Sequence, residues 1–250
     1  MTNNTRENSN LNKIRRCFNR ASPTYDQYSY PQQIIGSHLI SSLSKYLSSI
    51  DSVIDIGCGS GIITAQLAAM LKCENFYAVD ISDELIAQAK KRLKPYCIQF
   101  INADFDSLVL NDGLFQLGFS NMALHWSGDF CNTLLLINRM IADNGILAFT
   151  IPMDGTFSEL ASKNNFFTFE DIKLSLINSG FELLEYFDES LTFGFDSWIK
   201  ALKSIKATGA NYVFNRNTKS LANNTHHFRE LSSLTYKTGY FIARKKYHVI

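Results

Sequence analysis

The sequence lacks several features that would place it in a familiar class. Its 250 residues carry a formal net charge of only +1, so no excess of positive charge is available to neutralise a track of phosphates. It has no apolar run long enough to span a membrane, and residues 1–10 are polar, without the apolar segment of a secretory signal. We therefore expect a cytoplasmic protein that binds neither nucleic acid nor membranes.

Cysteine is also sparse. Five cysteines are scattered along the chain, never in C-x-x-C spacing: Cys17, Cys58, Cys73, Cys97 and Cys131. An odd number without that spacing favours reduced thiols over a disulfide framework or a zinc site, so we expect no bound metal. With 46% hydrophobic and 19% charged residues, the composition is that of a globular enzyme. The length suits a flexible tail at 1–10 followed by a single domain at 11–250.

Apolar, strand-like runs alternate with helical patterns through most of the chain. We expect the strands at 52–57, 75–80, 97–101, 115–120, 145–151, 181–187 and 236–244. We expect the helices between them at 61–72, 82–93, 129–142, 169–180 and 196–207. This alternation predicts an α/β fold in which a mostly parallel sheet of seven strands carries helices on both faces, with helical insertions after the fifth and sixth strands.

The N-terminal region has helical spacing of its own. Apolar residues recur at helical intervals from Leu11, and we expect Pro23 to end this helix. Pro31 is expected to open a second helix that runs to about Leu47. Residues 11–48 therefore form a helical segment ahead of the first strand.

A turn with glycines at alternate positions follows the first strand. Gly57, Gly59 and Gly61 come directly after Asp55, and Asp80 ends the second strand. A glycine turn admits a ligand against the backbone, and a carboxylate about twenty residues later can bind a ribose hydroxyl. The alternative is a turn that only joins a strand to a helix. Since polar residues also follow the third and fourth strands, at Asp104 and Asn121, we expect a nucleotide-type cofactor site at this edge of the sheet.

The G-x-G-x-G rhythm opened by an acid resembles motif I of the class I S-adenosylmethionine-dependent methyltransferases, and it disfavours a nicotinamide dehydrogenase. The resemblance implies a Rossmann-like fold and S-adenosylmethionine as cofactor. It implies that Asp55 lies under the methionine end, that Asp80 binds the ribose, and that Ile81 packs on the adenine. The full set of cofactor-binding residues that it implies is Asp55, Gly57, Cys58, Gly59, Gly61, Asp80, Ile81, Ala103, Asp104, Asn121 and Met122.

The rest of the chain narrows the resemblance. It lacks the D/N-P-P-Y/F tetrad of amino-methylating enzymes and has Ser120-Asn121-Met122-Ala123-Leu124-His125-Trp126 instead. That run, with the segments at 18–26, 155–160, 202–211 and 235–240, resembles the malonyl-acyl carrier protein O-methyltransferases of biotin synthesis. The family implies methyl transfer to the free carboxylate of malonyl-acyl carrier protein or malonyl-coenzyme A, giving the ester that primes pimeloyl synthesis. His125 departs from the pattern, because glutamine is common there.

Such a reaction needs alignment more than it needs a base, since a carboxylate is already ionised at neutral pH. We expect Tyr25 and Trp126 beside the methyl group, and Asn121 and His125 at the rim, as the catalytic candidates. His125 serves equally well as a hydrogen-bonding residue. The family resemblance implies that 11–48 forms a lid over the cofactor and that 152–235 is an elaboration on the substrate side.

A substrate carboxylate or an acidic carrier protein calls for cations. Lys200, Lys203 and Lys206 share one face of the helix expected at 196–207, and Arg20 is a further candidate. The alternative is that this face is simply solvated. A methyltransferase for another small acid or a quinone-type carbon, and a catalytically silent cofactor-binding scaffold, stay open as functions. We expect a monomer.

Overall fold

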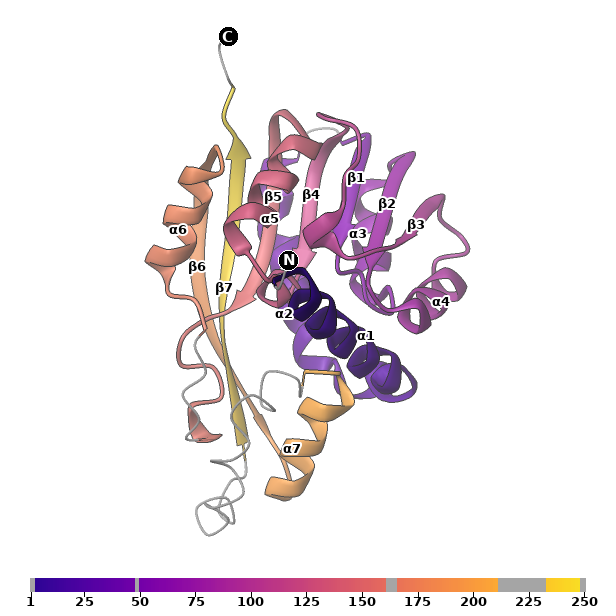
Figure 1. Cartoon of the computed structure of the whole chain (residues 1–250), viewed down its shortest axis with the longest axis vertical. Coiled ribbons are helices and arrows are strands. Elements are labelled where there is room, and N and C mark those ends of the chain that lie inside the picture. The colour runs from indigo at the N-terminus through magenta and orange to yellow at the C-terminus, as the bar shows by residue number, and fades with distance from the viewer. Residues whose placement is uncertain (1–2, 48–49, 161–165, 211–232, 248–250) are drawn as a thin grey trace.

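A computed structural model describes the chain at residues 3–47, 50–160, 166–210 and 233–247. The described part is built on one seven-stranded sheet in the order β3-β2-β1-β4-β5-β7-β6 (Figure 1). The strands are β1 Ser52–Ile56, β2 Asn75–Asp80, β3 Ile98–Asn102, β4 Phe115–Asn121, β5 Ile141–Pro152, β6 Phe181–Gly194 and β7 Ser233–Lys245. The first five strands are parallel and β7 runs antiparallel between β5 and β6. The prediction of a mostly parallel sheet is confirmed.

Helices cover both faces of the sheet because its strands are apolar on both sides. Neighbouring residues of β1 enter different cores: Val53 packs with α2 (Tyr30–Leu43) and α3 (Ile62–Leu71). Ile54 packs with α5 (Phe130–Met140) and α6 (Phe169–Asn178). This two-sided burial is the reason that the strands read as continuous apolar runs. None of the described helices is both long and apolar enough to cross a membrane.

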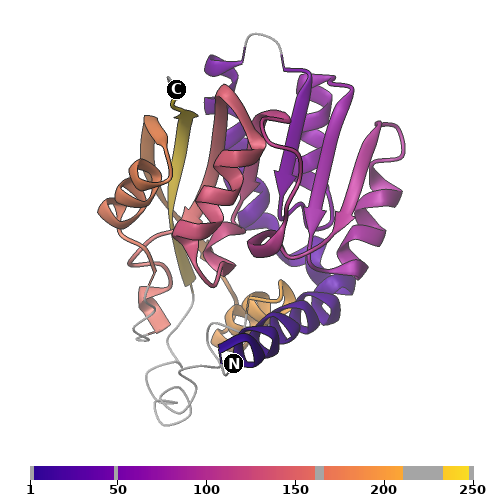
Figure 2. The same ribbon diagram turned by 45° about the horizontal axis from the view of Figure 1, so that its top comes forward.

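The first helix, α1, is longer than the sequence predicted. It runs over Asn3–Tyr28, through Pro23 and through most of the expected tail at 1–10. A proline inside a helix costs about 3 kcal/mol, because it removes a hydrogen bond and crowds the preceding turn. Here α1 packs on α4 (Asp83–Arg92) along one side and on α7 (Trp198–Ala207) along another, and Figure 2 shows α7 beside it. These tertiary contacts offset the local cost.

Several other boundaries also differ from the sequence expectations. The strands β6 and β7 pair along their whole length, so both extend beyond the ranges 181–187 and 236–244. The second helix ends at Leu43 and continues as a short 3-10 turn, Ser44–Tyr46, rather than reaching Leu47 as α-helix. The carboxyl ends of β1, β2 and β4 nevertheless meet at one edge of the sheet, and α1 crosses that edge (Figure 1).

Candidate active site

The glycine turn ties the end of β1 to the end of β2. The backbone N–H groups of Gly57 and Cys58 both donate to the carbonyl of Val79, at 2.8 and 3.0 Å. Gly57 has a φ of +81°, and a Cβ there would lie 2.2 Å from the Cβ of Ala123. Only glycine therefore fits this position, and its bare backbone forms part of a cavity wall.

Asp80 is buried beside this turn. One carboxylate oxygen accepts the N–H of Gly59 and the other accepts the N–H of Ser82, each at 2.8 Å. Burial raises the pKa of Asp80 to about 6, although these hydrogen bonds act to lower it. A carboxylate offers about four lone-pair sites, so about two remain for ligand hydroxyls. Asp80 thus has the acceptor capacity that a ribose diol requires.

Asp55 lies deeper under the turn. Its carboxylate accepts the hydroxyl of Thr64 at 2.7 Å, and burial raises the pKa of Asp55 to about 7. Burial also raises the pKa of the Cys58 thiol, which lines the same cavity as Asp55. The thiol therefore stays protonated and uncharged at neutral pH.

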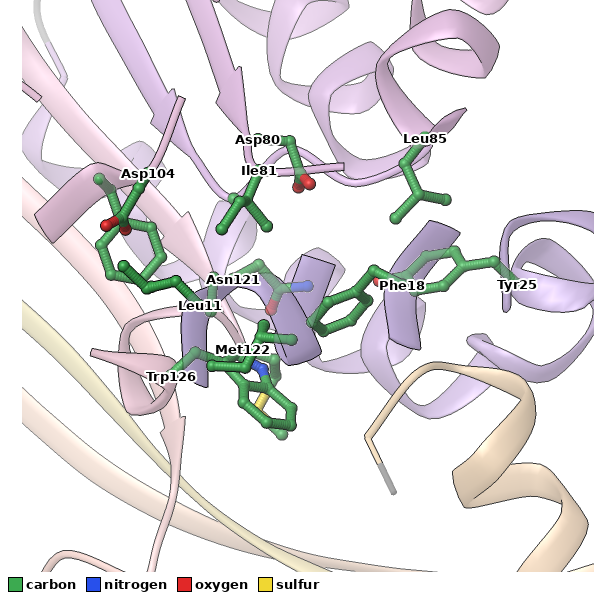
Figure 3. A pocket seen from close by; sticks show the side chains of 14 residues that line it. Leu11, Phe18, Tyr25, Asp80, Ile81, Leu85, Asp104, Asn121, Met122 and Trp126 are labelled. Atoms are coloured by element: carbon green, nitrogen blue, oxygen red, sulfur yellow. The ribbon is translucent and has the colours of Figure 1, made fainter. Parts of the chain in front are cut away.

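The strand ends at β3 and β4 complete the rim. Asp104 lines the cavity together with Ile81, and it accepts the N–H of Asp106 at 3.1 Å. The N–H of Ala103 donates to the carbonyl of Asp80, so this backbone donor is already used inside the protein. Figure 3 places Asp80, Ile81 and Leu85 on one side of the cavity, with side chains of α1 opposite them.

Asn121 connects two elements rather than presenting a free amide. Its Nδ2 donates to the carbonyl of Gln32 in α2 at 2.9 Å, and its Oδ1 accepts the hydroxyl of Thr150 in β5 at 2.8 Å. The next residue, Met122, has a φ of +53°, a strained conformation for a non-glycine residue. Its N–H donates to the same Thr150 hydroxyl, which fixes the turn at the end of β4.

Three cavities adjoin one another at this edge of the sheet, and Tyr25 of α1 lines all of them. The first contains the rim residues around Asp80 and is closed by Phe18 and other α1 side chains (Figure 3). The second reaches down to Asp55 under the glycine turn. The third opens on the far side of Trp126. A ligand that fills the first two therefore meets the occupant of the third beside Tyr25.

The third cavity is aromatic and uncharged. No described residue that lines it is an acid, a lysine or an arginine. Burial lowers the pKa of His125 to about 3, so its imidazole is neutral, and burial raises the pKa of the Tyr25 and Tyr236 hydroxyls. Trp126 packs edge-on against Phe18, with ring centroids 5.4 Å apart. All these groups stay neutral at physiological pH.

Two polar atoms on the walls of this cavity are buried and unpaired. They are Nδ1 of His125 and Oε1 of Gln32. A buried polar atom without a hydrogen bond costs about 1–3 kcal/mol, so each is suited to receive a partner from a ligand. Oε1 of Gln32 can only accept a hydrogen bond, whereas Nδ1 of a neutral imidazole donates or accepts according to the tautomer.

The cations expected near the substrate lie elsewhere. Lys200 forms an ion pair with Asp196, which lies just before the start of α7. Arg20, Lys203 and Lys206 line a separate groove between α1 and α7. The structure thus brings Tyr25, Asn121, His125 and Trp126 together with those predicted cofactor residues that line the first two cavities, and it leaves the four cations outside. Gly59, Gly61 and Ala103 line none of the three cavities. The described residues contain no cluster of His, Cys, Asp or Glu that could hold a metal.

Sequence reasoning missed some residues that build the site. Gln32 and Tyr236 line the third cavity, and Arg92 donates to both Asp26, at 2.5 Å, and the carbonyl of Ser60. Arg92 therefore holds the end of α1 against the glycine turn. Tyr236 falls within the segment 235–240, which offered a signal, whereas Gln32 and Arg92 sit in ordinary helical patterns.

Comparisons with known proteins agree with this architecture. A family model described as Methyltransferase domain matches residues 54–149, which carry most of the predicted cofactor residues. A malonyl-[acyl-carrier protein] O-methyltransferase 2 of Coxiella burnetii is 35% identical over 247 residues, covering 95% of this chain and 98% of the relative. A malonyl-[acyl-carrier protein] O-methyltransferase of Buchnera aphidicola is 27% identical over 219 residues, covering 84% and 85%.

Solved structures are similar in fold at low identity. The YcgJ protein of Bacillus subtilis has a TM-score of 0.62 at 15% identity, covering 85% of this chain and all of that one. The [4+2]-cyclase SpnF has a TM-score of 0.60 at 16% identity, covering 85% and 81%. Since one of these neighbours is a cyclase, the likeness supports the fold alone and leaves the reaction to the site.

Proposed function

The chain belongs to the malonyl-[acyl-carrier protein] O-methyltransferase family, and we propose that it methylates the free carboxylate of a malonyl group carried as a thioester by acyl carrier protein. The product is a methyl ester, which masks the charge of the malonyl group and primes pimeloyl synthesis. The observation that carries this proposal is the aromatic, uncharged cavity that adjoins the cofactor cavities at Tyr25.

The residues of the rim fit the cofactor of this family. S-adenosylmethionine, when bound, supplies a methyl group on a positively charged sulfur. Asp80 would accept the ribose hydroxyls with its remaining lone pairs, and Ile81 would pack on the adenine. Asp55 and the glycine turn would hold the methionine end in the deeper cavity. The bare backbone at Gly57 leaves space for this close approach.

The chemistry asks little of a base. A carboxylate oxygen of the substrate forms a bond to the methyl carbon while the bond from that carbon to sulfur breaks, and the electron pair stays on sulfur. A carboxylic acid ionises near pH 4, so the nucleophile is already deprotonated at neutral pH. Alignment alone supplies up to about 7–11 kcal/mol of such a barrier. Because the charges of the two reactants cancel in the transition state, a dry aromatic cavity favours the reaction.

Neutral hydrogen-bond donors orient the nucleophile in this proposal. Tyr25 and Tyr236 keep their protons because burial raises the pKa of both hydroxyls. His125 has an unpaired Nδ1, which donates in the tautomer that carries its proton there, and it cannot become a cation at physiological pH. Neutral donors hold a carboxylate without forming an ion pair that would weaken it as a nucleophile. Trp126 supplies the apolar wall, and Asn121 acts by positioning α2 and the β4 turn.

The direct test is transfer of a labelled methyl group. We expect S-adenosylmethionine with a labelled methyl to label malonyl-acyl carrier protein as an ester that mild alkali releases as methanol. Butyryl-acyl carrier protein is the matched control, because it has a similar chain length and no free carboxylate. Equal labelling of the two carriers, or label that resists alkali, would contradict methylation of the malonyl carboxylate.

A further inference from the structure

A groove between α1 and α7 lies outside the site described above. Its volume is about 270 Å³, and its walls include Cys17, Arg20, Thr24 and Tyr28 of α1 together with Lys203 and Lys206 of α7. The α1 residues recur at helical intervals, so they form one face of that helix. Phe18 and Tyr25 are on the neighbouring face, which lines the substrate cavity.

The groove concentrates positive charge that the described protein does not neutralise. In the part of the chain that the structure describes, no ion pair involves Arg20, Lys203 or Lys206. Lys200 differs, because it pairs with Asp196, which lies just before the start of α7. Three uncompensated cations around one cavity repel one another, and a bound anion would relieve that repulsion.

The groove also adjoins the substrate cavity. Thr24 donates its hydroxyl to the carbonyl of Ala207, at 3.2 Å, and both residues line the groove. Thr208 and Ala210, only one and three residues further on, line the substrate cavity. A Cβ at Gly209 would lie 2.7 Å from the ring of Phe18, so the end of α7 is in tight contact with α1 here. The groove and the substrate cavity therefore lie on either side of the contact between α1 and the end of α7.

We propose that this groove binds the phosphate of the phosphopantetheine arm on which the carrier protein holds its malonyl group; the proposal rests on the function proposed above. The arm has the thioester at one end and a phosphodiester at the other, so its two ends contact different parts of the enzyme. Arg20 can donate two parallel hydrogen bonds to phosphate oxygens, and the ammonium groups of Lys203 and Lys206 add electrostatic attraction. Coenzyme A carries a phosphate at the same place on its arm.

Two small substrates test the role of the phosphate. Malonyl-pantetheine and malonyl-4′-phosphopantetheine differ only by that group. We expect the wild-type enzyme to prefer the phosphorylated compound about tenfold in kcat/KM, the factor for one good charged contact. Lys203→Gln combined with Lys206→Gln should bring this ratio close to one. Lys200→Gln is the matched control on the same helix, and it should keep the ratio of the wild type.

The other outcomes are informative as well. Equal kcat/KM for the two compounds in the wild type would overturn the proposal. So would a loss in the double variant that is confined to malonyl-acyl carrier protein and spares malonyl-coenzyme A, because the groove would then recognise the protein surface of the carrier. An equal loss on all substrates with a lowered melting temperature would assign the lysines to folding.

A binding measurement separates this proposal from the proposed function. Calorimetric titration with 4′-phosphopantetheine, which has no malonyl group, should show binding to the wild type and at least tenfold weaker binding to the double variant. Inorganic phosphate at the same concentration should compete weakly. If the wild-type enzyme bound 4′-phosphopantetheine in this way but methylated no malonyl thioester, the proposed function would be wrong, while the assignment of the groove to the phosphate would hold. Absence of binding would overturn the groove assignment itself.

Discussion

On the proposed cofactor side of the site, Asp55, Asp80 and Asn121 all hold hydrogen bonds within the protein. On the proposed substrate side, His125 Nδ1 is buried without a partner, and so is Oε1 of Gln32, which lines both the second and the third cavity. The cofactor side is thus organised before any ligand arrives. The substrate side keeps polar atoms whose desolvation cost of about 1–3 kcal/mol each is recovered only when a ligand pairs with them. The cofactor side is therefore suited to bind one ligand that is always the same. The substrate side becomes more stable only when a ligand supplies hydrogen-bond partners for its buried polar atoms.

The two sides also differ in how the chain builds them. The cofactor side comes from the ends of strands that lie next to one another in the sheet, so short local motifs specify it. The substrate side combines α1, the start of α2, the turn Leu124–Trp126, the first half of β7 and residues 208–210. Its composition depends on the whole topology, above all on the placement of β7 between β5 and β6.

Among the substitutions considered, one at Gly57 should lower the stability of the protein and its affinity for the cofactor most strongly. Gly57→Ala places a methyl group 2.2 Å from Ala123 in a backbone conformation with φ of +81°. Overpacking and the positive φ together should lower the free energy of unfolding by about 2–5 kcal/mol, measured by urea denaturation. Affinity for S-adenosylhomocysteine should fall as the turn shifts.

Gly113 provides the matched control for Gly57. It also has a positive φ, of +66°, but the nearest atom to its added Cβ would be 3.9 Å away. Gly113→Ala should therefore show only the backbone cost of about 1–2 kcal/mol and no change in ligand affinity. An equal effect of the two substitutions would mean that the close approach at Gly57 is unimportant.

Asp80 tests whether the ribose is bound as we propose. Asp80→Ala should weaken S-adenosylhomocysteine binding by about 1.5–3 kcal/mol, the range for hydrogen bonds to a charged group. Calorimetry on the folded variant measures this loss. Asp104→Ala, on the same rim, should cost less, because Asp104 is only half buried. An unaltered dissociation constant for Asp80→Ala would remove the ribose role.

The cofactor side could be read from the sequence because its signals are local. The strand Asn75–Asp80 lies at its predicted residues, and Asp80 stands where the motif requires. Gly57 was singled out by its spacing, and the clash that a side chain would meet there gives the physical reason. The roles of individual site residues stay predictions until variants are measured.

The substrate side could not be read in the same way. Pro23 indicated a helix end, yet contacts with α4 and α7 carry α1 through it. Gln32 gave no sign of a special role, because its position depends on how α2 packs against β4. Sequence spacing puts Lys200, Lys203 and Lys206 on one helix face, but only the structure separates Lys200, which pairs with Asp196, from the two lysines that line the groove.

Substitutions of His125 should have a moderate effect on substrate turnover. His125→Phe removes the free Nδ1 while keeping an aromatic ring, and it should lower kcat/KM for the malonyl substrate by about fivefold, or about 1 kcal/mol. His125→Gln should restore most of the loss, since an amide can also pair with the substrate. Affinity for S-adenosylhomocysteine should be unaffected in both variants.

The pH dependence distinguishes hydrogen bonding from general-base catalysis at His125. Burial lowers the pKa of His125 to about 3, so the imidazole does not titrate in the working range. Single-turnover rates should then be nearly flat from about pH 6.5 to 8.5. A single-proton rise in that range which disappears in His125→Gln would identify a base instead.

Asp55 gives the smallest effect and the sharpest check on how the cofactor side is organised. Burial raises the folded-state pKa of Asp55 from 3.8 to about 7, with Thr64 opposing and Asp80 adding to the shift. A raised carboxyl pKa contributes stability that is fully present below the unfolded pKa and is lost as pH rises through the folded pKa. The ligand-free protein should therefore lose about 1 kcal/mol of unfolding free energy through Asp55 between about pH 6 and 8.5.

Asp55→Asn keeps an oxygen that accepts the Thr64 hydroxyl and cannot ionise, so its stability should fall less over the same interval. Parallel urea titrations of the two proteins measure the difference. If their curves fell in parallel, Asp55 would already be ionised in the folded protein, and the cofactor side would hold a permanent buried charge under the glycine turn.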